Sequence, residues 1–200
     1  MSADSGRTGL DVVRLPRLTL PAGQVAYRIH SREHRPWWFS ADGRFGLTGP
    51  RGTCYLTLEP LGAYIETLGR FGAPIYPANI AARRLSAVLL PNSVELVDLR
   101  PRTILGAGLH PSISMGDDYS RSQTLAADVD TGGLGGIIYP LSHDSEADLT
   151  GIALFDRSGA QPHLPVLGTG PISDALIGRA VTEFGLTVWQ GPANTYPTVV

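Results

Sequence analysis

Apolar and polar residues alternate over residues 25–30, Val-Ala-Tyr-Arg-Ile-His, which is the clearest pattern in the first part of the chain. A period of two is typical of a half-buried β-strand. The alternation places Tyr27 on one face of this strand and Arg28 on the other. Runs of β-forming or apolar residues predict further strands at residues 53–58, 84–90, 94–99, 136–139 and 151–155.

Helical spacing of apolar residues predicts helices over residues 61–70, 119–130 and 173–184. The first follows the break at Pro60, the second is capped by Asp117 or Asp118, and Ser173 begins the third. Neither an internal repeat nor a coiled-coil pattern is present. The chain is therefore assigned to the α+β class, with a mixed β-sheet core and short flanking helices.

The remaining segments define the expected domain organisation. Residues 1–22 carry polar, proline-bounded turns and are expected to form a loosely packed arm. The domain is assigned to residues 23–160, and residues 161–200 to a C-terminal extension whose one helix packs on it. Residues 31–51 lack periodicity, and a loop of that length inside a compact domain is usually functional.

Composition narrows the chemistry that is available. All 16 basic residues are Arg, so no lysine can form a Schiff base or a phosphate-loop contact. The formal net charge of -2, with 17% charged residues, disfavours binding to nucleic acid or to anionic lipid. Cys54 lies in an apolar run, which favours a small core residue over a nucleophile.

Cysteine count and hydropathy also predict a location. One cysteine forms no internal disulfide, which fits a reducing compartment. The N-terminal residues lack an apolar signal core, and no run approaches the ~18 apolar residues of a membrane span. We therefore expect a soluble, cytoplasmic protein.

Several common site motifs are missing from the sequence. The five histidines form no recognised ligand pattern, so no metal site is predicted. No Gly-x-Ser-x-Gly elbow of a serine hydrolase is present. The glycines at positions 43, 46, 49 and 52 follow a loop and open no helix, which argues against a dinucleotide fingerprint.

The candidate chemistry gathers in residues 43–66. Arg44 lies beside two glycines and a phenylalanine in a glycine-rich loop and offers a planar cation that can bind phosphate bidentately, although an exposed turn arginine is equally compatible. Tyr55 presents a ring and a hydroxyl on a strand, and the alternative is a surface tyrosine. Glu66 flanks the buried stripe of the predicted helix, where a carboxylate needs a partner or a function.

Short motifs in this order make the chain resemble the RES-domain family, the toxin half of RES-Xre toxin-antitoxin pairs. The match extends over about residues 25–156. The motifs are Tyr27-Arg28-Ile29-His30, the loop from Trp37-Trp38-Phe39-Ser40 to Gly43-Arg44-Phe45, Gly52-Thr53-Cys54-Tyr55-Leu56, Ala63-Tyr64-Ile65-Glu66, Tyr119-Ser120-Arg121-Ser122-Gln123, and Gly136-Ile137-Ile138-Tyr139 to His143-Asp144 followed by Leu154-Phe155.

The resemblance implies a fold similar to ADP-ribosyltransferase toxins and NAD⁺ as the substrate, with no bound cofactor and with inorganic phosphate as a co-substrate in phosphorylases. It implies that Arg28 and Arg44 hold the pyrophosphate, Tyr55 lines the nicotinamide-ribose pocket, and Glu66 is the catalytic carboxylate. Gln123 is added to the substrate-binding residues from its motif. Arg44 or Arg51 would hold the attacking phosphate of a phosphorylase.

The loop after residues 136–139 departs from the family pattern. Members read Tyr-x-Ser-Arg-His-Asp, whereas an ungapped alignment here puts Leu141 at the family's serine position and Ser142 at its arginine position. Either Ser142 replaces the serine through a one-residue shift, or a polar contact to the substrate is lost.

The resemblance leaves the type of activity open. Cleavage of NAD⁺ by phosphorolysis or hydrolysis is the leading hypothesis. A catalytically weakened nucleotide-binding module and an ADP-ribosyltransferase are the alternatives. An Xre-type antitoxin and a homodimer are the partners that the family implies.

Overall fold

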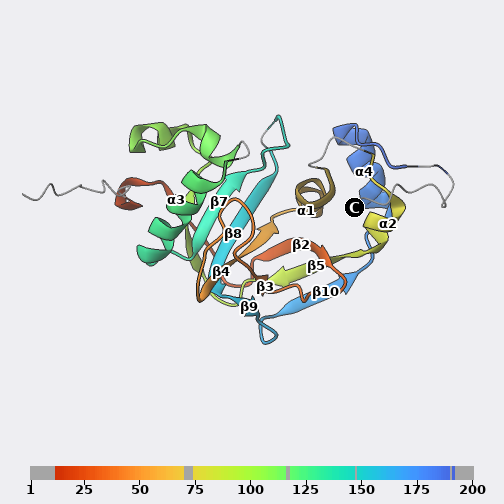
Figure 1. Ribbon diagram of the computed structural model, residues 1–200, viewed down its shortest axis with the longest axis horizontal. Coiled ribbons are helices and arrows are strands. Elements are labelled where there is room, and N and C mark those ends of the chain that lie inside the picture. Colours follow the sequence, from red (N-terminus) through yellow and green to blue (C-terminus); the bar gives the residue numbers. More distant parts are fainter. Residues whose placement is uncertain (1–11, 70–73, 116–117, 147, 190, 192–200) are drawn as a thin grey trace, which may run out of the picture.

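An eight-stranded mixed sheet forms the centre of the computed structural model, which describes residues 12–69, 74–115, 118–146, 148–189 and 191 (Figure 1). In sheet order the strands are β1 (Arg17–Leu20), β6 (Val94–Asp98), β7 (Gly136–Pro140), β8 (Thr150–Arg157), β4 (Arg51–Thr57), β2 (Val25–Ser31), β5 (Arg83–Leu89) and β10 (Val166–Gly170). Neighbouring strands are antiparallel except β6 and β7. A small sheet of β3 (Trp38–Phe39) and β9 (Gly159–Ala160) continues into a bridge between Ser40 and Thr53 of β4.

The helices are short. They are α1 (Pro60–Tyr64), which continues into the π-helical turn η2 (Ile65–Gly69), then α2 (Pro77–Ala81), α3 (Ser120–Thr131) and α4 (Asp174–Phe184), with 3₁₀ turns η1 (Val12–Arg14), η3 (Arg102–Ala107) and η4 (Pro111–Ser114). In Figure 1, α3 lies at one end of the molecule, α2 and α4 lie at the other, and α1 lies between them. Within the described ranges, a helix with the length and apolar character of a bilayer span is not found.

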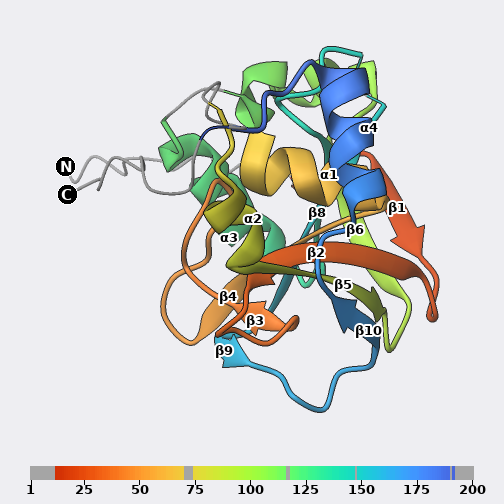
Figure 2. The ribbon, with the colours of Figure 1, turned by 90° about the vertical axis from the view of Figure 1, so that its right-hand side faces the viewer.

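The large sheet is buried on both faces. One apolar cluster joins the sheet to α1, α3 and α4 through residues such as Tyr64, Leu125 and Leu176. The other cluster lies on the opposite face, where Trp37 and Phe39 cover it. Figure 2 shows α1 and α4 together on the same side of β2 and β5. The helices therefore leave the second face to the loop before β4.

The continuous apolar runs of β7 and β8 follow from this double burial. Ile137 belongs to the cluster under the helices and Ile138 to the cluster on the other face, and neither side chain is exposed. A strand that is buried on both faces needs apolar residues at consecutive positions. The α+β class, the strands predicted at residues 25–30 and 53–58, and the helix after Ser173 are confirmed.

The N-terminal arm differs from the prediction. Residues 1–11 lie outside the described ranges, but Arg17–Leu20 forms β1 at the edge of the sheet, and Leu15 and Leu20 are buried. Proline on either side of this strand resembles a turn in the sequence, yet proline is compatible with the ends of edge strands.

The segment after Phe155 also contains strands that the sequence did not predict. Val166–Gly170 pairs with β5 through an irregular register, and its glycines conceal the β pattern. The helix predicted over residues 61–70 becomes a π-helical turn at Ile65, while Arg70 itself lies outside the described residues. The C-terminal helix α4 packs against α1.

Candidate active site

A cleft of about 920 Å³ opens on the face of the sheet that carries α1. This volume lies in the range of ~300–1,000 Å³ that is common for small-molecule sites. The lining comes from β2, the loop at residues 40–44, β4, the α1–η2 segment and residues 139–143. The lining side chains that offer charge, hydroxyl or aromatic groups are Tyr27, Arg28, Ser40, Asp42, Arg44, Tyr55, Thr57, Glu66, Thr67, Arg83, Tyr119, Tyr139, Ser142 and His143.

The cleft arises where two central strands separate. Strands β2 and β4 are neighbours in the sheet, but they pair only at Tyr27 and Thr57. Beyond that pair each strand bonds to its other neighbour, so Arg28 and Tyr55 border the same opening from different strands. The site therefore depends on an incomplete strand pairing that joins residues distant in sequence.

The loop that carries Arg44 is anchored to β4 and α3. The Phe45 amide donates to the Tyr55 hydroxyl at 2.8 Å, and Gln123 Nε2 donates to the Gly43 carbonyl at 3.2 Å. Gly43 has φ of +93°, and a Cβ atom there would lie 2.8 Å from the Tyr55 hydroxyl oxygen. Glycine is thus required both by the backbone and by the close approach of Tyr55.

Arg44 lines the cleft from this loop, and part of its guanidinium has no hydrogen-bond acceptor in the described part of the chain. Its guanidinium carbon lies 4.8 Å from the centre of the Tyr119 ring, which is a cation–π geometry. Nη1 of Arg44 is buried and has no hydrogen-bond acceptor among the described residues. A buried donor of this kind is costly unless a ligand supplies the acceptor.

Glu66 lies on the π-helical turn and lines the same cleft. Its negative charge affects two tyrosines there. Burial, followed by the charge of Glu66, raises the pKa of Tyr55 and of Tyr139 well above the ordinary value of 10.0. Both hydroxyls therefore stay protonated at neutral pH. Single π turns within helices often mark functional sites because they displace a side chain from helical register.

Arg28 uses part of its guanidinium for structure. Nη1 donates to the carbonyl oxygens of Pro36 at 2.6 Å and of Trp38 at 2.9 Å, and it lies 3.2 Å from Cys54 Sγ. Burial raises the pKa of the Cys54 thiol, and the side chain is fully buried. Cys54 is thus a core residue. Arg28 holds the segment around Pro36 and Trp38 close to β4 and also borders the cleft.

Comparison with known proteins identifies the family. The RES domain model matches residues 25–172. The chain belongs to the RES-domain family. Among solved structures, the crystal structure of the M. tuberculosis MbcT-MbcA toxin-antitoxin complex contains a chain with a TM-score of 0.63 and 18% identity. The similarity covers 80% of this chain and 90% of that chain, which confirms the fold. No curated protein matches this chain.

The loop after β7 contains Leu141 and Ser142, where the sequence departs from the family pattern. Leu141 is 1% exposed, and its methyl groups contact the backbone positions of Gly62 and Gly151, where an added Cβ would lie 3.3 and 2.8 Å away. Ser142 and His143 line the cleft instead. Leu141 is therefore a core residue, and the replacement of the family's serine by Ser142 stays a prediction.

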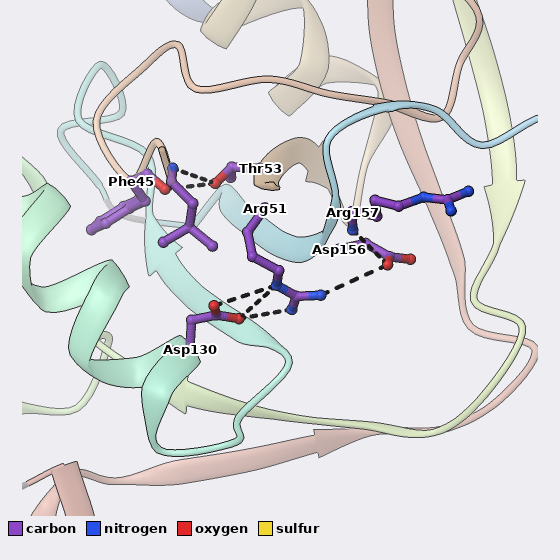
Figure 3. A network of polar contacts seen from close by, with 7 residues as sticks. Phe45, Arg51, Thr53, Asp130, Asp156 and Arg157 are labelled. Atoms are coloured by element: carbon purple, nitrogen blue, oxygen red, sulfur yellow. Dashed lines mark hydrogen bonds and ion pairs between the residues drawn. The ribbon is translucent and has the colours of Figure 1, made fainter. Parts of the chain in front are cut away.

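Gln123 and Arg51 were also expected at the substrate or phosphate site, but they lie outside the cleft lining. Gln123 does not line the cleft but supports it through its bond to Gly43. Arg51 does not line the cleft either. It forms a bidentate ion pair with Asp130, with the shortest N–O distance 2.7 Å, and lies 3.9 Å from Asp156 (Figure 3). Arg44, Arg28, Tyr55, Glu66 and Ser142 do share the cleft.

Sequence reasoning assigned no role to several residues that the RES domain brings to the cleft, including Arg83, Tyr139 and His143. The position of Arg83 could be inferred only once the strand pairing is known. Strand pairing places Arg83 opposite Ser31, and alternation along β5 puts it on the same face as Leu85, which is opposite Ile29. This inference needs the pairing of β2 with β5, which the sequence alone does not give.

Proposed function

We propose that this RES-domain protein is an enzyme that cleaves the bond between nicotinamide and ribose in NAD⁺. The observation that carries the proposal is the presence of Arg44, with a buried unsatisfied donor, and the carboxylate of Glu66 in one cleft. An anionic nucleotide would supply a hydrogen-bond acceptor to Arg44. The carboxylate of Glu66 would stabilise a cationic sugar intermediate.

Binding of the dinucleotide would use both charge and aromatic surface. Arg44 and the free part of the Arg28 guanidinium are suited to the pyrophosphate, because guanidinium groups bind phosphate oxygens bidentately. Tyr55 and Tyr119 line the cleft and give ring surfaces on which the planar groups of the substrate can stack. Ser142, which lines the cleft, would donate or accept one further hydrogen bond to the substrate.

Cleavage of the glycosidic bond develops positive charge on the ribose, as in glycoside hydrolysis. Glu66 stabilises that charge or orients the ribose hydroxyls. The electron pair of the breaking C–N bond returns to the nicotinamide nitrogen, which becomes neutral, so no general acid is required. An oxygen of inorganic phosphate or of water then bonds to the anomeric carbon, and with water one proton is released.

Regulation by a protein partner is part of the same proposal. The structural neighbour was crystallised as a toxin-antitoxin complex. By analogy we propose that this protein is the toxin of such a pair and that an Xre-type antitoxin restrains it.

Incubation of the purified protein with NAD⁺, with and without inorganic phosphate, tests the reaction. Free nicotinamide is expected, and its dependence on phosphate separates phosphorolysis from hydrolysis. Labelled NAD⁺ in the presence of protein acceptors would reveal transfer of ADP-ribose instead. Binding of NAD⁺ without any nicotinamide release would contradict the enzymatic assignment and favour a nucleotide-binding module.

A further inference from the structure

A third arginine, Arg83, borders the cleft from β5. Its backbone position is opposite Ser31 of β2, on the face that also carries Ile29 and Tyr27. The sheet order is β4, β2, β5, so Arg83 and Tyr55 lie on opposite sides of β2. The loop of Arg44 is bonded to Tyr55, which means that cations reach the cleft from both sides of this strand.

The guanidinium of Arg83 is not used by the fold. Among the described residues, it has no hydrogen-bond acceptor and no carboxylate within ion-pair distance. By contrast, the nearby Arg28 already donates to two carbonyl groups. Arg83 is only partly exposed, so its position in the cleft is not that of a fully solvated surface arginine.

The charge of the cleft lining supports an anionic ligand beyond what Arg44 alone would bind. The lining holds the guanidinium groups of Arg28, Arg44 and Arg83 against the carboxylates of Asp42 and Glu66. Asp42 is exposed, where water screens its charge. A guanidinium in a partly desolvated cleft forms its strongest hydrogen bonds with phosphate-type oxygens.

We infer that Arg83 binds a phosphate oxyanion at the β5 side of the cleft. This inference rests on the proposed function for its natural ligand, which is either the pyrophosphate of the dinucleotide or the inorganic phosphate that attacks the ribose. Arg83 binds the anion and takes no part in bond cleavage.

The neighbouring residue on the same strand is a matched control. Arg84 carries the same charge, but it does not line the cleft, and its Nη1 donates to the backbone carbonyl of Arg83 at 2.9 Å. Replacement of either residue by Gln removes one positive charge from the same strand. A difference between Arg83→Gln and Arg84→Gln therefore reports the cleft rather than the net charge of the protein.

The first experiment measures steady-state kinetics of nicotinamide release for the wild type, Arg83→Gln, Arg83→Lys and Arg84→Gln. Loss of a charge-assisted hydrogen bond is expected to raise one KM by about 10- to 100-fold in Arg83→Gln. A rise in the KM for NAD⁺ assigns the pyrophosphate, and a rise in the KM for phosphate assigns the attacking anion. Arg83→Lys should recover part of the loss, and Arg84→Gln should stay within about twofold of the wild type.

The second experiment separates this inference from the proposed reaction. Calorimetric titration with ADP and with inorganic phosphate measures anion binding without turnover. Weaker binding by folded Arg83→Gln, in a protein that releases no nicotinamide, would sustain the anion site and reject the reaction. Active Arg83→Gln with unchanged KM values and unchanged ADP and phosphate binding would overturn the site. Absence of both turnover and anion binding in the wild type would overturn both.

Discussion

Arg44 and Arg51 lie seven positions apart in one stretch of sequence, yet their surroundings differ completely. Arg51 forms an ion pair with Asp130 and lies 3.9 Å from Asp156, and its side chain is partly exposed to solvent. Arg44 reaches the cleft, where a tyrosine ring is its neighbour and Nη1 has no acceptor among the described residues. A guanidinium that the protein neutralises contributes to folding, whereas one left without an anion is available to a ligand.

The same contrast holds for whole regions. The Arg51 network contains charged groups that are paired within the protein, and the two apolar clusters pack their buried side chains against one another. The cleft gathers charged and hydroxyl groups whose best contacts come from a substrate. We therefore expect substitutions in the cleft to lower turnover more than stability, and substitutions outside it to do the reverse.

The largest effect is expected for Glu66→Gln. Removal of the negative charge withdraws stabilisation from the cationic sugar, and turnover should fall by about 10³-fold. The melting temperature should change little, because Gln keeps the shape of the side chain. Nicotinamide release measures the first quantity and thermal unfolding the second. Glu59→Gln, in an exposed position at the start of α1, is the control and should keep full turnover.

Leu141→Ala should produce the largest loss of stability. The side chain is buried against Gly62 and Gly151, so its truncation leaves a cavity that lowers the free energy of unfolding by about 2–5 kcal/mol. Ser142→Ala should leave this free energy nearly unchanged and raise the KM for NAD⁺. Denaturant unfolding and kinetics on both variants test this division. Equal stability of the two variants would place Leu141 outside the core.

Arg44→Gln and Arg51→Gln test the difference between the cleft arginine and the ion-paired arginine. Arg44→Gln is expected to lower kcat/KM for NAD⁺ by about 10- to 100-fold, because a charge-assisted contact to the substrate is lost. Arg51→Gln should lower the free energy of unfolding by no more than about 1 kcal/mol, since its side chain is 41% exposed and the ion pair is screened by water. Similar kinetic losses in both variants would contradict the comparison.

Gly43→Ala should lower both turnover and stability, because Gly43 lies in the cleft and also fixes the loop beside Tyr55. The positive φ is strained for alanine, and the added Cβ would displace the Tyr55 hydroxyl, for a loss of about 1–3 kcal/mol together with reduced turnover. Gly49→Ala is the matched control, because Gly49 also has a positive φ, +81°, but no atom lies within 4 Å of its Cβ position. Its stability should fall without loss of turnover. Unfolding and kinetic measurements on both variants distinguish strain from collision.

The smallest effect concerns His30, which is buried on strand β2 with Nε2 2.8 Å from the Ser86 hydroxyl. Burial, together with the nearby Arg28, lowers its pKa from the ordinary 6.5, while the Ser31 carbonyl opposes the shift. The unfolded chain therefore takes up the proton first, and stability that is complete above pH 6.5 decreases as the pH falls below it. Unfolding at pH 7.5 and pH 5.5 should differ by about 1 kcal/mol or less from this source, and His30→Gln should reduce the difference.

Local sequence patterns were sufficient to predict the elements with strong periodicity and to bring the candidate site residues to attention. Alternation in residues 25–30 and double burial in residues 136–139 require strands, and Arg44, Tyr55 and Glu66 lie within one short stretch. Motifs in family order indicated the RES-domain family, and the family model confirms it over residues 25–172. Edge strands β1 and β10 were missed because prolines and glycines weaken their local pattern.

Which arginines share the cleft depends on contacts between distant parts of the chain. The sequence pattern indicated Arg44 and Arg51 and gave no sign of Arg83, but the pairing of β2 with β4 and β5 brings Arg44 and Arg83 to one cleft and leaves Arg51 with Asp130. Likewise, the core space beside Gly62 buries Leu141 and turns Ser142 toward the cleft. Strand pairing and packing act between residues far apart in the chain, so no local pattern can encode their outcome.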